Sequence, residues 1–202
     1  ETLQLEAPNL RISAITRVDH QLEKLATGEF DAAIHPRLAT YDADFSVDLL
    51  VTWPPILIVR KGHPLTDLST PLNADGMEQV LSFPRVILCM QDLEWFVSRW
   101  GVDFRRRVEL MRVAVETSNM VSALEIVKRT DCTFYSSPYL CSYPPLGDDL
   151  EIVEIPYTRQ EVGEYVLVSH KRVENSALHQ WLRKKILEAA RRLDAETFPN
   201  QH

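Results

Sequence analysis

The segment Leu22–Ile34, LEKLATGEFDAAI, decides the fold, because it joins a helix to a strand through a single glycine. Its first half repeats apolar residues at the spacing of one helical face. Gly28 then stands where a helix ends in left-handed backbone, a conformation that glycine adopts easily. The run Asp31–His35, DAAIH, predicts a short buried strand that ends at Pro36. A helix that feeds directly into a strand is typical of an α/β domain.

Strand-like and helical stretches alternate outward from this segment to both ends of the chain. The predicted strands are Leu10–Ile15, Phe45–Val51, Ile56–Arg60, Arg85–Met90, Val108–Val115, Thr133–Ser136, Leu150–Ile155 and Tyr165–His170. The predicted helices include Asp75–Leu81, Leu93–Trp100, Asn119–Arg129 with Ser118 as its N-cap, and the closing helix Ser176–Leu193. This order predicts an α/β fold in which helices flank mostly parallel sheet.

The composition is that of a globular protein that does not itself bind DNA. The 202 residues are 45% hydrophobic and 25% charged, which is enough for one domain or two small lobes. The net charge of -7 repels phosphate, so any DNA contact must come from a segment outside this sequence. The apolar runs are much shorter than the roughly 20 residues needed to cross a bilayer, so we expect no membrane association.

The sequence offers no recognisable catalytic or metal-binding motif. It contains neither a GxSxG elbow nor a phosphate-binding glycine loop, and its six histidines lack the HExxH spacing. An odd number of cysteines, Cys89, Cys132 and Cys141, indicates reduced core thiols, with a redox pair of Cys132 and Cys141 as the alternative. We therefore predict no catalytic residue, no metal ligand and no cofactor.

Four segments follow one another in a familiar order. They are Glu6–Leu10 (EAPNL), Leu22–Ile34, Ile56–Leu65 (ILIVRKGHPL), and the pair VLVSHKR and SALHQWLR within Val166–Arg183. They resemble, in turn, the AP.L link, the L..L..G.LDLAI element, the crossing strand with its His-Pro-Leu turn, and the last strand with its closing WLR helix. All four belong to the effector-binding domain of LysR-type transcription regulators, which the chain resembles over nearly its whole length.

This resemblance implies a two-lobed fold like that of type 2 periplasmic binding proteins. Two crossing strands, near Thr52–Arg60 and Ile155–Glu164, would join the lobes. Residues 1–54 and 159–202 would form the first lobe, with its first strand missing, and residues 55–158 would form the second. The N-terminal winged helix-turn-helix domain of such regulators is absent from this chain.

The resemblance also implies a cytoplasmic sensor that is not an enzyme. Its partners would be a small-molecule effector, promoter DNA through the absent domain, and a second copy of itself in a dimer or tetramer. The predicted interface between copies is formed by Leu3, Leu5, Leu10, Ile12, Met120 and Leu124. The segment Arg129–Pro138 lacks the glycines that many relatives have there. In this respect the chain resembles the branch of the family that includes nodulation regulators and sensors of aromatic compounds.

The effector site is expected where strands end, because ligands of α/β sheets bind at the carboxyl ends of strands. The loops at these positions carry hydroxyl, amide and N–H groups that suit a small anion or an aromatic acid. The predicted effector residues are Thr16, Arg17, His35, Gln91, Thr117, Ser118, Asn119, Ser136 and Ser137. For His35, capping a strand end is the alternative role.

Two other functions fit the same fold. A secreted solute-binding protein would carry an export signal upstream of Glu1, where a regulator carries its DNA-binding domain. A lyase or dehydratase would place two titratable side chains together in the cleft, such as His35 with Asp19 or Asp92.

Overall fold

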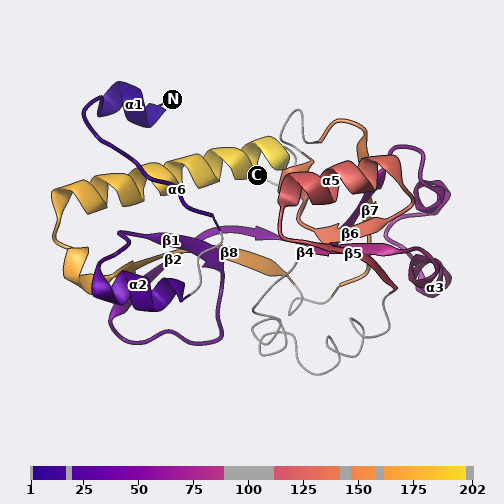
Figure 1. The fold of residues 1–202 in the computed structure, drawn as a ribbon, viewed down its shortest axis with the longest axis horizontal. Coiled ribbons are helices and arrows are strands. Elements are labelled where there is room, and N and C mark those ends of the chain that lie inside the picture. The colour runs from indigo at the N-terminus through magenta and orange to yellow at the C-terminus, as the bar shows by residue number, and fades with distance from the viewer. Residues whose placement is uncertain (1, 17–19, 89–111, 142–146, 158–161, 199–202) are drawn as a thin grey trace. The chain divides into compact units, whose positions relative to one another are not determined.

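The structure is a computed structural model that describes residues 2–16, 20–88, 112–141, 147–157 and 162–198 (Figure 1). The chain divides into two compact units. Unit 1 comprises residues 1–36, 40–51 and 165–192, and unit 2 comprises 37–39, 52–164 and 193–202. The predicted lobes differ from these units at residues 37–39, 52–54, 159–164 and 193–202, all of which group with unit 2.

Unit 1 is built on a small sheet. Its strands have the order β1-β8-β2, and β1 runs antiparallel to β8 with Ala33 opposite Val168. Leu25, Val166 and Val168 form its buried core. The helices and strands that lie wholly or mostly in this unit are α1 (Thr2–Glu6), α2 (Gln21–Thr27), β1 (Ala33–Pro36), β2 (Phe45–Trp53), β8 (Gly163–His170), η4 (Lys171–Val173) and α6 (Ala177–Thr197).

Unit 2 contains a larger, mixed sheet with the strand order β5-β4-β6-β3-β7. Strand β4 is parallel to both β5 and β6, whereas β3 is antiparallel to both β6 and β7. Its elements are β3 (Ile56–Arg60), η1 (Pro64–Asp67), α3 (Ala74–Ser82), β4 (Arg85–Leu88), β5 (Val113–Thr117), α5 (Met120–Arg129), β6 (Thr133–Ser136), η2 (Pro138–Leu140) and β7 (Leu150–Glu154).

The central strand β3 is buried on both faces of this sheet. Ile56 and Ile58 pack with helix α5 in one cluster, whereas Leu57 and Val59 join α3 and η1 in another. Successive side chains of a strand point to opposite faces, so the apolar run ILIV supplies two cores at once.

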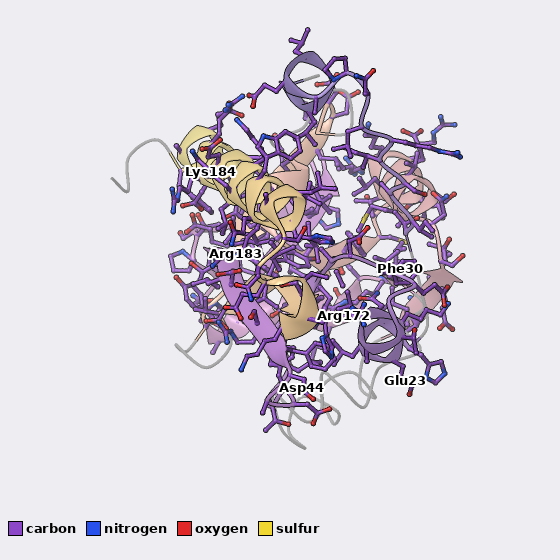
Figure 2. The ribbon with its side chains drawn as sticks, turned by 90° about the vertical axis from the view of Figure 1, so that its left-hand side faces the viewer. Glu23, Phe30, Asp44, Arg172, Arg183 and Lys184 are labelled. Carbon is purple, nitrogen blue, oxygen red and sulfur yellow. The ribbon has the colours of Figure 1, made fainter. Side chains whose placement is uncertain are left out.

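Polar side chains fix several helix ends. Gly28 ends α2 at φ 87°, as its position predicted, and the Arg172 guanidinium lies over it and hydrogen-bonds to the Ala26 carbonyl. Figure 2 labels Arg172 together with Glu23 of α2. The N-cap of α5 is Asn119, whose side chain accepts from the Ser122 N–H at 3.0 Å. The prediction of Ser118 as this N-cap was therefore wrong by one residue.

The α/β fold class is confirmed, but three details of the sequence prediction were wrong. Residues 10–15 form no strand, since they pair with no described strand, and Ile12 and Ile15 are exposed. The sheets are not mostly parallel, because β1 is antiparallel to β8 in unit 1 and the sheet of unit 2 is mixed. Strand β1 lies at a sheet edge and leaves Ile34 54% exposed, so it is not a buried strand. The predicted helix Leu93–Trp100 lies outside the described residues.

Candidate functional site

The predicted effector residues of unit 2 lie at one edge of its sheet. Strands β5 and β6 flank β4 and both run parallel to it, so their carboxyl ends meet at the same edge. Neighbouring strands lie about 4.8 Å apart, so the two strand ends are separated by roughly 10 Å. The sheet thus brings Thr117, Ser118 and Asn119 to the same edge as Ser136 and Ser137. Gln91 lies outside the described residues.

The loop after β5 is organised by its own side chains. The Thr117 hydroxyl accepts from the Asn119 N–H at 3.2 Å, and the Asn119 side chain caps helix α5. These bonds use both side chains to hold the turn. Ser118 is exposed between them, and its hydroxyl makes no hydrogen bond to another described residue. In this loop, the Ser118 side chain is therefore available to bind a ligand at the start of α5.

The loop after β6 is held by Tyr139, which follows the buried Ser137 by two residues. The Tyr139 hydroxyl lies 2.6 Å from an Asp194 carboxylate oxygen and 3.0 Å from the Thr52 carbonyl oxygen. Its ring meets those of Trp53 and Phe198 edge to face. Burial and the bond to Asp194 raise the pKa of Tyr139, so the hydroxyl remains a donor. Tyr139 was not predicted from sequence, because its partners are 55 and 87 residues away.

The remaining predicted effector residues belong to unit 1. Thr16 is exposed, whereas Arg17 lies outside the described residues. His35 is half-buried, with its Nδ1 2.7 Å from the Pro36 carbonyl oxygen and its ring 5.9 Å from that of Tyr41. A bond to the adjacent carbonyl fits the strand-capping alternative for His35.

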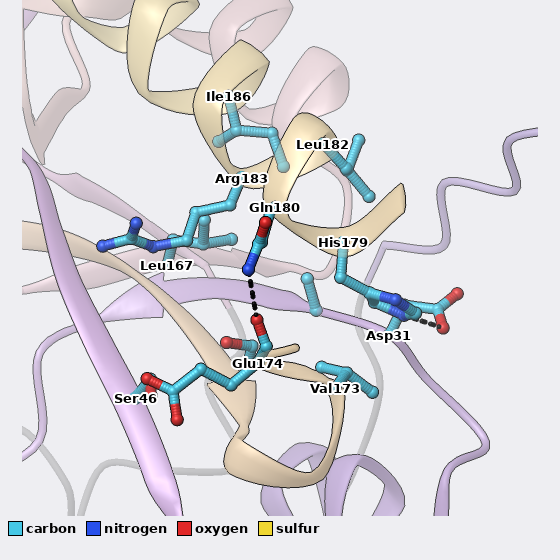
Figure 3. A pocket seen from close by; sticks show the side chains of 12 residues that line it. Asp31, Ser46, Leu167, Val173, Glu174, His179, Gln180, Leu182, Arg183 and Ile186 are labelled. Carbon is cyan, nitrogen blue, oxygen red and sulfur yellow. Dashed lines mark hydrogen bonds and ion pairs between the residues drawn. The ribbon is translucent and has the colours of Figure 1, made fainter. Parts of the chain in front are cut away.

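Unit 1 contains a hollow that the sequence did not indicate (Figure 3). Its volume is about 390 Å³, and it lies between the first half of α6, the turn η4 and the sheet. We call it the α6 hollow, and it is lined by Asp31, Ala32, Ser46, Leu167, Ser169, Val173, Glu174, His179, Gln180, Leu182, Arg183 and Ile186. These residues come from three distant parts of the chain, so no local motif could have revealed them.

Side-chain bonds hold the rim of the α6 hollow. His179 bridges Asp31, at 2.9 Å from Nε2, and Ser176, at 2.8 Å from Nδ1. Gln180 donates to the Glu174 carbonyl oxygen at 2.9 Å, as Figure 3 shows. Arg183 is paired through two nitrogens with Asp48, and this hydrogen bonding raises the pKa of the guanidinium.

The predicted contacts between copies differ strongly in exposure. Leu5 is 83% exposed and Ile12 48% exposed, whereas Leu3, Leu10 and Met120 are half-buried. Leu124 is completely buried in the core under α5, which corrects its place in the predicted interface. The apolar side chain that α5 exposes is that of Val121, at 51%.

Two cysteines fall within the described residues. Cys132 and Cys141 are free thiols that pack in the same core cluster, and burial raises the pKa of Cys141 to about 11. A protonated thiol is a poor nucleophile, which favours the core role over the redox pair. The described part of the chain contains neither a helix able to span a bilayer nor a cluster of three or more potential metal ligands. Cys89 lies outside the described residues.

Several solved structures share this architecture. A probable transcriptional regulator from Pseudomonas aeruginosa matches with 18% identity and a TM-score of 0.69, over 92% of this chain and 58% of its own length. The C-terminal domain of a probable LysR family transcriptional regulator from Rhodococcus matches with 19% identity and a TM-score of 0.68, over 92% and 88%. The regulatory domain of MexT, a transcriptional activator in Pseudomonas aeruginosa, matches with 15% identity and a TM-score of 0.68, over 93% and 88%.

These likenesses and the α/β architecture with two sheets confirm the periplasmic-binding-protein-like fold. The search of curated proteins found no match. The profile of the LysR substrate binding domain matches residues 1–191, which is almost the entire chain. The chain therefore belongs to the LysR substrate binding domain family.

Proposed function

We propose that this chain is the effector-binding domain of a LysR-type transcription regulator and senses a small anion or an aromatic acid. The family match over residues 1–191 supports the sensor role. The chain spans only 58% of the Pseudomonas aeruginosa regulator it matches, so promoter DNA would be bound by a domain outside this sequence. In this proposal the chain assembles with copies of itself in the cytoplasm and catalyses no reaction.

The proposal of an anionic ligand rests on the sheet edge of unit 2. The loops after β5 and β6 both carry hydroxyl groups at this edge, and the loop after β5 leads directly into the N-terminus of α5, a helix of ten residues. Unpaired N–H groups at a helix start carry partial positive charge, which stabilises a carboxylate. Ser118 would bind the ligand directly, because Thr117 and Asn119 are occupied in the turn.

The proposed effector residues also include three of unit 1. Arg17 is proposed to form a two-nitrogen pair with the ligand carboxylate, which is among the strongest hydrogen-bonding arrangements in proteins. Thr16 and His35 complete the proposed set in unit 1, as do Gln91, Ser136 and Ser137 in unit 2. An aromatic effector also agrees with the glycine-poor segment Arg129–Pro138 and the branch of regulators that it resembles.

A thermal-shift screen of this chain against benzoate, salicylate and short-chain carboxylates tests the proposal. A ligand at 100 times its dissociation constant should stabilise the fold by about 2.7 kcal/mol. Ser118→Ala and Arg17→Ala should each weaken the binding of a hit while leaving the melting temperature without ligand unchanged. Ser82→Ala is the control, since Ser82 lies at the end of α3 and bonds only locally.

A saturable hit that both variants weaken supports the proposal. Unchanged affinity in both variants would remove these residues from the site, and no hit across the panel would contradict an anionic effector.

A further inference from the structure

We propose that the α6 hollow is a second ligand site, and that it binds a small organic cation with a short branched alkyl group. This site lies wholly within unit 1, and all its lining residues belong to that unit. The inference does not depend on the effector site, because it concerns different residues and a ligand of opposite charge.

The size and floor of the hollow suit a small alkyl group. Its volume of about 390 Å³ falls in the lower part of the range of roughly 300–1,000 Å³ typical of ligand pockets. Leu167 is 1% exposed and forms part of the floor. Figure 3 shows Leu182 and Ile186 reaching toward the hollow from α6, with Val173 below them. An alkyl group of four or five carbons would cover these side chains and gain by leaving water.

The charges around the hollow favour a cation. Its lining carries the carboxylates of Asp31 and Glu174 and a single guanidinium, that of Arg183. Arg183 is paired with Asp48 just outside the lining, and Asp31 is bonded to His179, so Glu174 is the lining carboxylate without an ion pair among the described residues. A ligand carboxylate would therefore be repelled, whereas an ammonium group would be attracted.

Glu174 is the side chain best placed to hold the ammonium. Among the residues that the structure describes, its carboxylate forms no ion pair within 4 Å, and its negative charge adds to the bond with Asp48 in raising the pKa of the Arg183 guanidinium. In Figure 3 the Glu174 carboxylate points in the direction of β2, the strand that carries Ser46. An ammonium group has three donors, and the lining offers this carboxylate and the hydroxyls of Ser46 and Ser169 as hydrogen-bond acceptors.

Three probes that share one alkyl group but differ in charge test whether the hollow selects its ligand by charge or by shape alone. Isoamylamine, isoamyl alcohol and isovalerate would be titrated into the 202-residue chain with labelled leucine, isoleucine and valine methyl groups. Isoamylamine should shift the Leu182 and Ile186 methyl signals to saturation. The alcohol should bind more weakly, and isovalerate should leave these signals unmoved. Isovalerate binding as tightly as the amine would overturn the proposed charge preference, and the absence of saturable shifts with isoamylamine would overturn the site.

A variant of Glu174 tests the predicted contact. Glu174→Gln should weaken isoamylamine binding about tenfold or more, because a hydrogen bond to a charged group contributes about 1.5–3 kcal/mol. Glu174 is exposed and its side chain makes no bond needed for folding, so the variant should keep the wild-type spectrum outside the hollow. The control is Glu78→Gln, an exposed carboxylate on α3 of unit 2, which should leave the affinity unchanged. Equal affinity in wild type and Glu174→Gln would contradict the assignment.

Discussion

The two units differ in how completely their helices cover their sheets. In unit 2, Ile56, Leu57, Ile58 and Val59 are at most 3% exposed, because α5 packs on one face and α3 on the other. Helix α6, which belongs to unit 1 up to residue 192, has no buried side chain and leaves a hollow against the sheet of that unit. Tight packing of this kind provides stability, whereas an incompletely filled layer leaves room for a ligand. We therefore expect unit 2 to be the rigid frame and unit 1 to be the more adaptable part.

The largest effect is expected from the core of unit 2. Leu124→Ala should lower the free energy of unfolding by about 2–5 kcal/mol, because it leaves a cavity among fully buried side chains. The matched change in unit 1 is Leu182→Ala at the α6 hollow, where a half-buried side chain loses less contact. This variant should cost below about 2 kcal/mol. Urea unfolding of both variants measures the difference, and equal losses would break the comparison between the units.

A smaller loss is expected at the end of α6, whose last residues belong to unit 2. Tyr139→Phe should cost about 1–3 kcal/mol, because it removes the hydroxyl that donates to the Asp194 carboxylate. Hydrogen exchange of residues 193–198 should become faster in this variant. Tyr157→Phe is the control, since Tyr157 is 50% exposed and should be close to neutral. Unchanged exchange in Tyr139→Phe would show that the hydroxyl does not hold the helix end.

The buried His63 should make the stability depend on pH. Burial lowers the pKa of His63, which is completely enclosed and accepts from the Leu65 N–H at 3.1 Å. The unfolded chain therefore binds a proton more readily, so the free energy of unfolding should fall as the pH drops below about 6.5. His63→Asn keeps the capping acceptor but cannot titrate in this range, and its stability should vary less between pH 7 and pH 5.

Chemical unfolding at several pH values checks this dependence. His20→Asn is the matched control, because the His20 side chain is 71% exposed and its loss should leave the wild-type profile intact. A wild-type profile that His63→Asn does not flatten would contradict the role of His63.

The smallest effect is expected at the rim of the α6 hollow. Arg183→Met should change the free energy of unfolding by about 0–1 kcal/mol, because the Arg183 side chain is 52% exposed and water screens its pair with Asp48. Lys184→Met, one residue away on the exposed face of α6, provides the reference. A loss above about 2 kcal/mol would mean that this ion pair supports unit 1 far more than a surface pair should.

The sequence predicted the parts of the fold that depend on local pattern. Gly28 marked the end of α2, and the run Thr133–Ser136 was recognised as a strand with its correct bounds. Strand direction was not predictable in the same way, because pairing is decided between segments far apart in the chain. Residues 10–15 have the composition of a strand, but composition cannot supply the neighbouring strand that a ladder requires.

The candidate functional residues likewise include some that local sequence pattern predicted and some that it did not. The loops after β5 and β6 could be predicted, since strand ends of parallel strands meet at one edge. The α6 hollow could not be predicted, because the bond between His179 and Asp31 joins residues 148 positions apart. Tyr139 was missed for the same reason, because its partner Asp194 is 55 residues away. Leu124 was assigned to the interface between copies, but the face of α5 that carries it packs into the core of unit 2.

Hydrogen exchange of the wild-type chain tests the difference between the units most directly. Amides of β3 and β6 should exchange only on global unfolding, whereas those of α6 between residues 177 and 192 should exchange through local opening at a lower free energy. We expect the two sets of amides to differ by several kcal/mol in free energy of opening. Equal protection of α6 and β3 would contradict it, because the incompletely packed helix would then be as firmly held as the buried sheet.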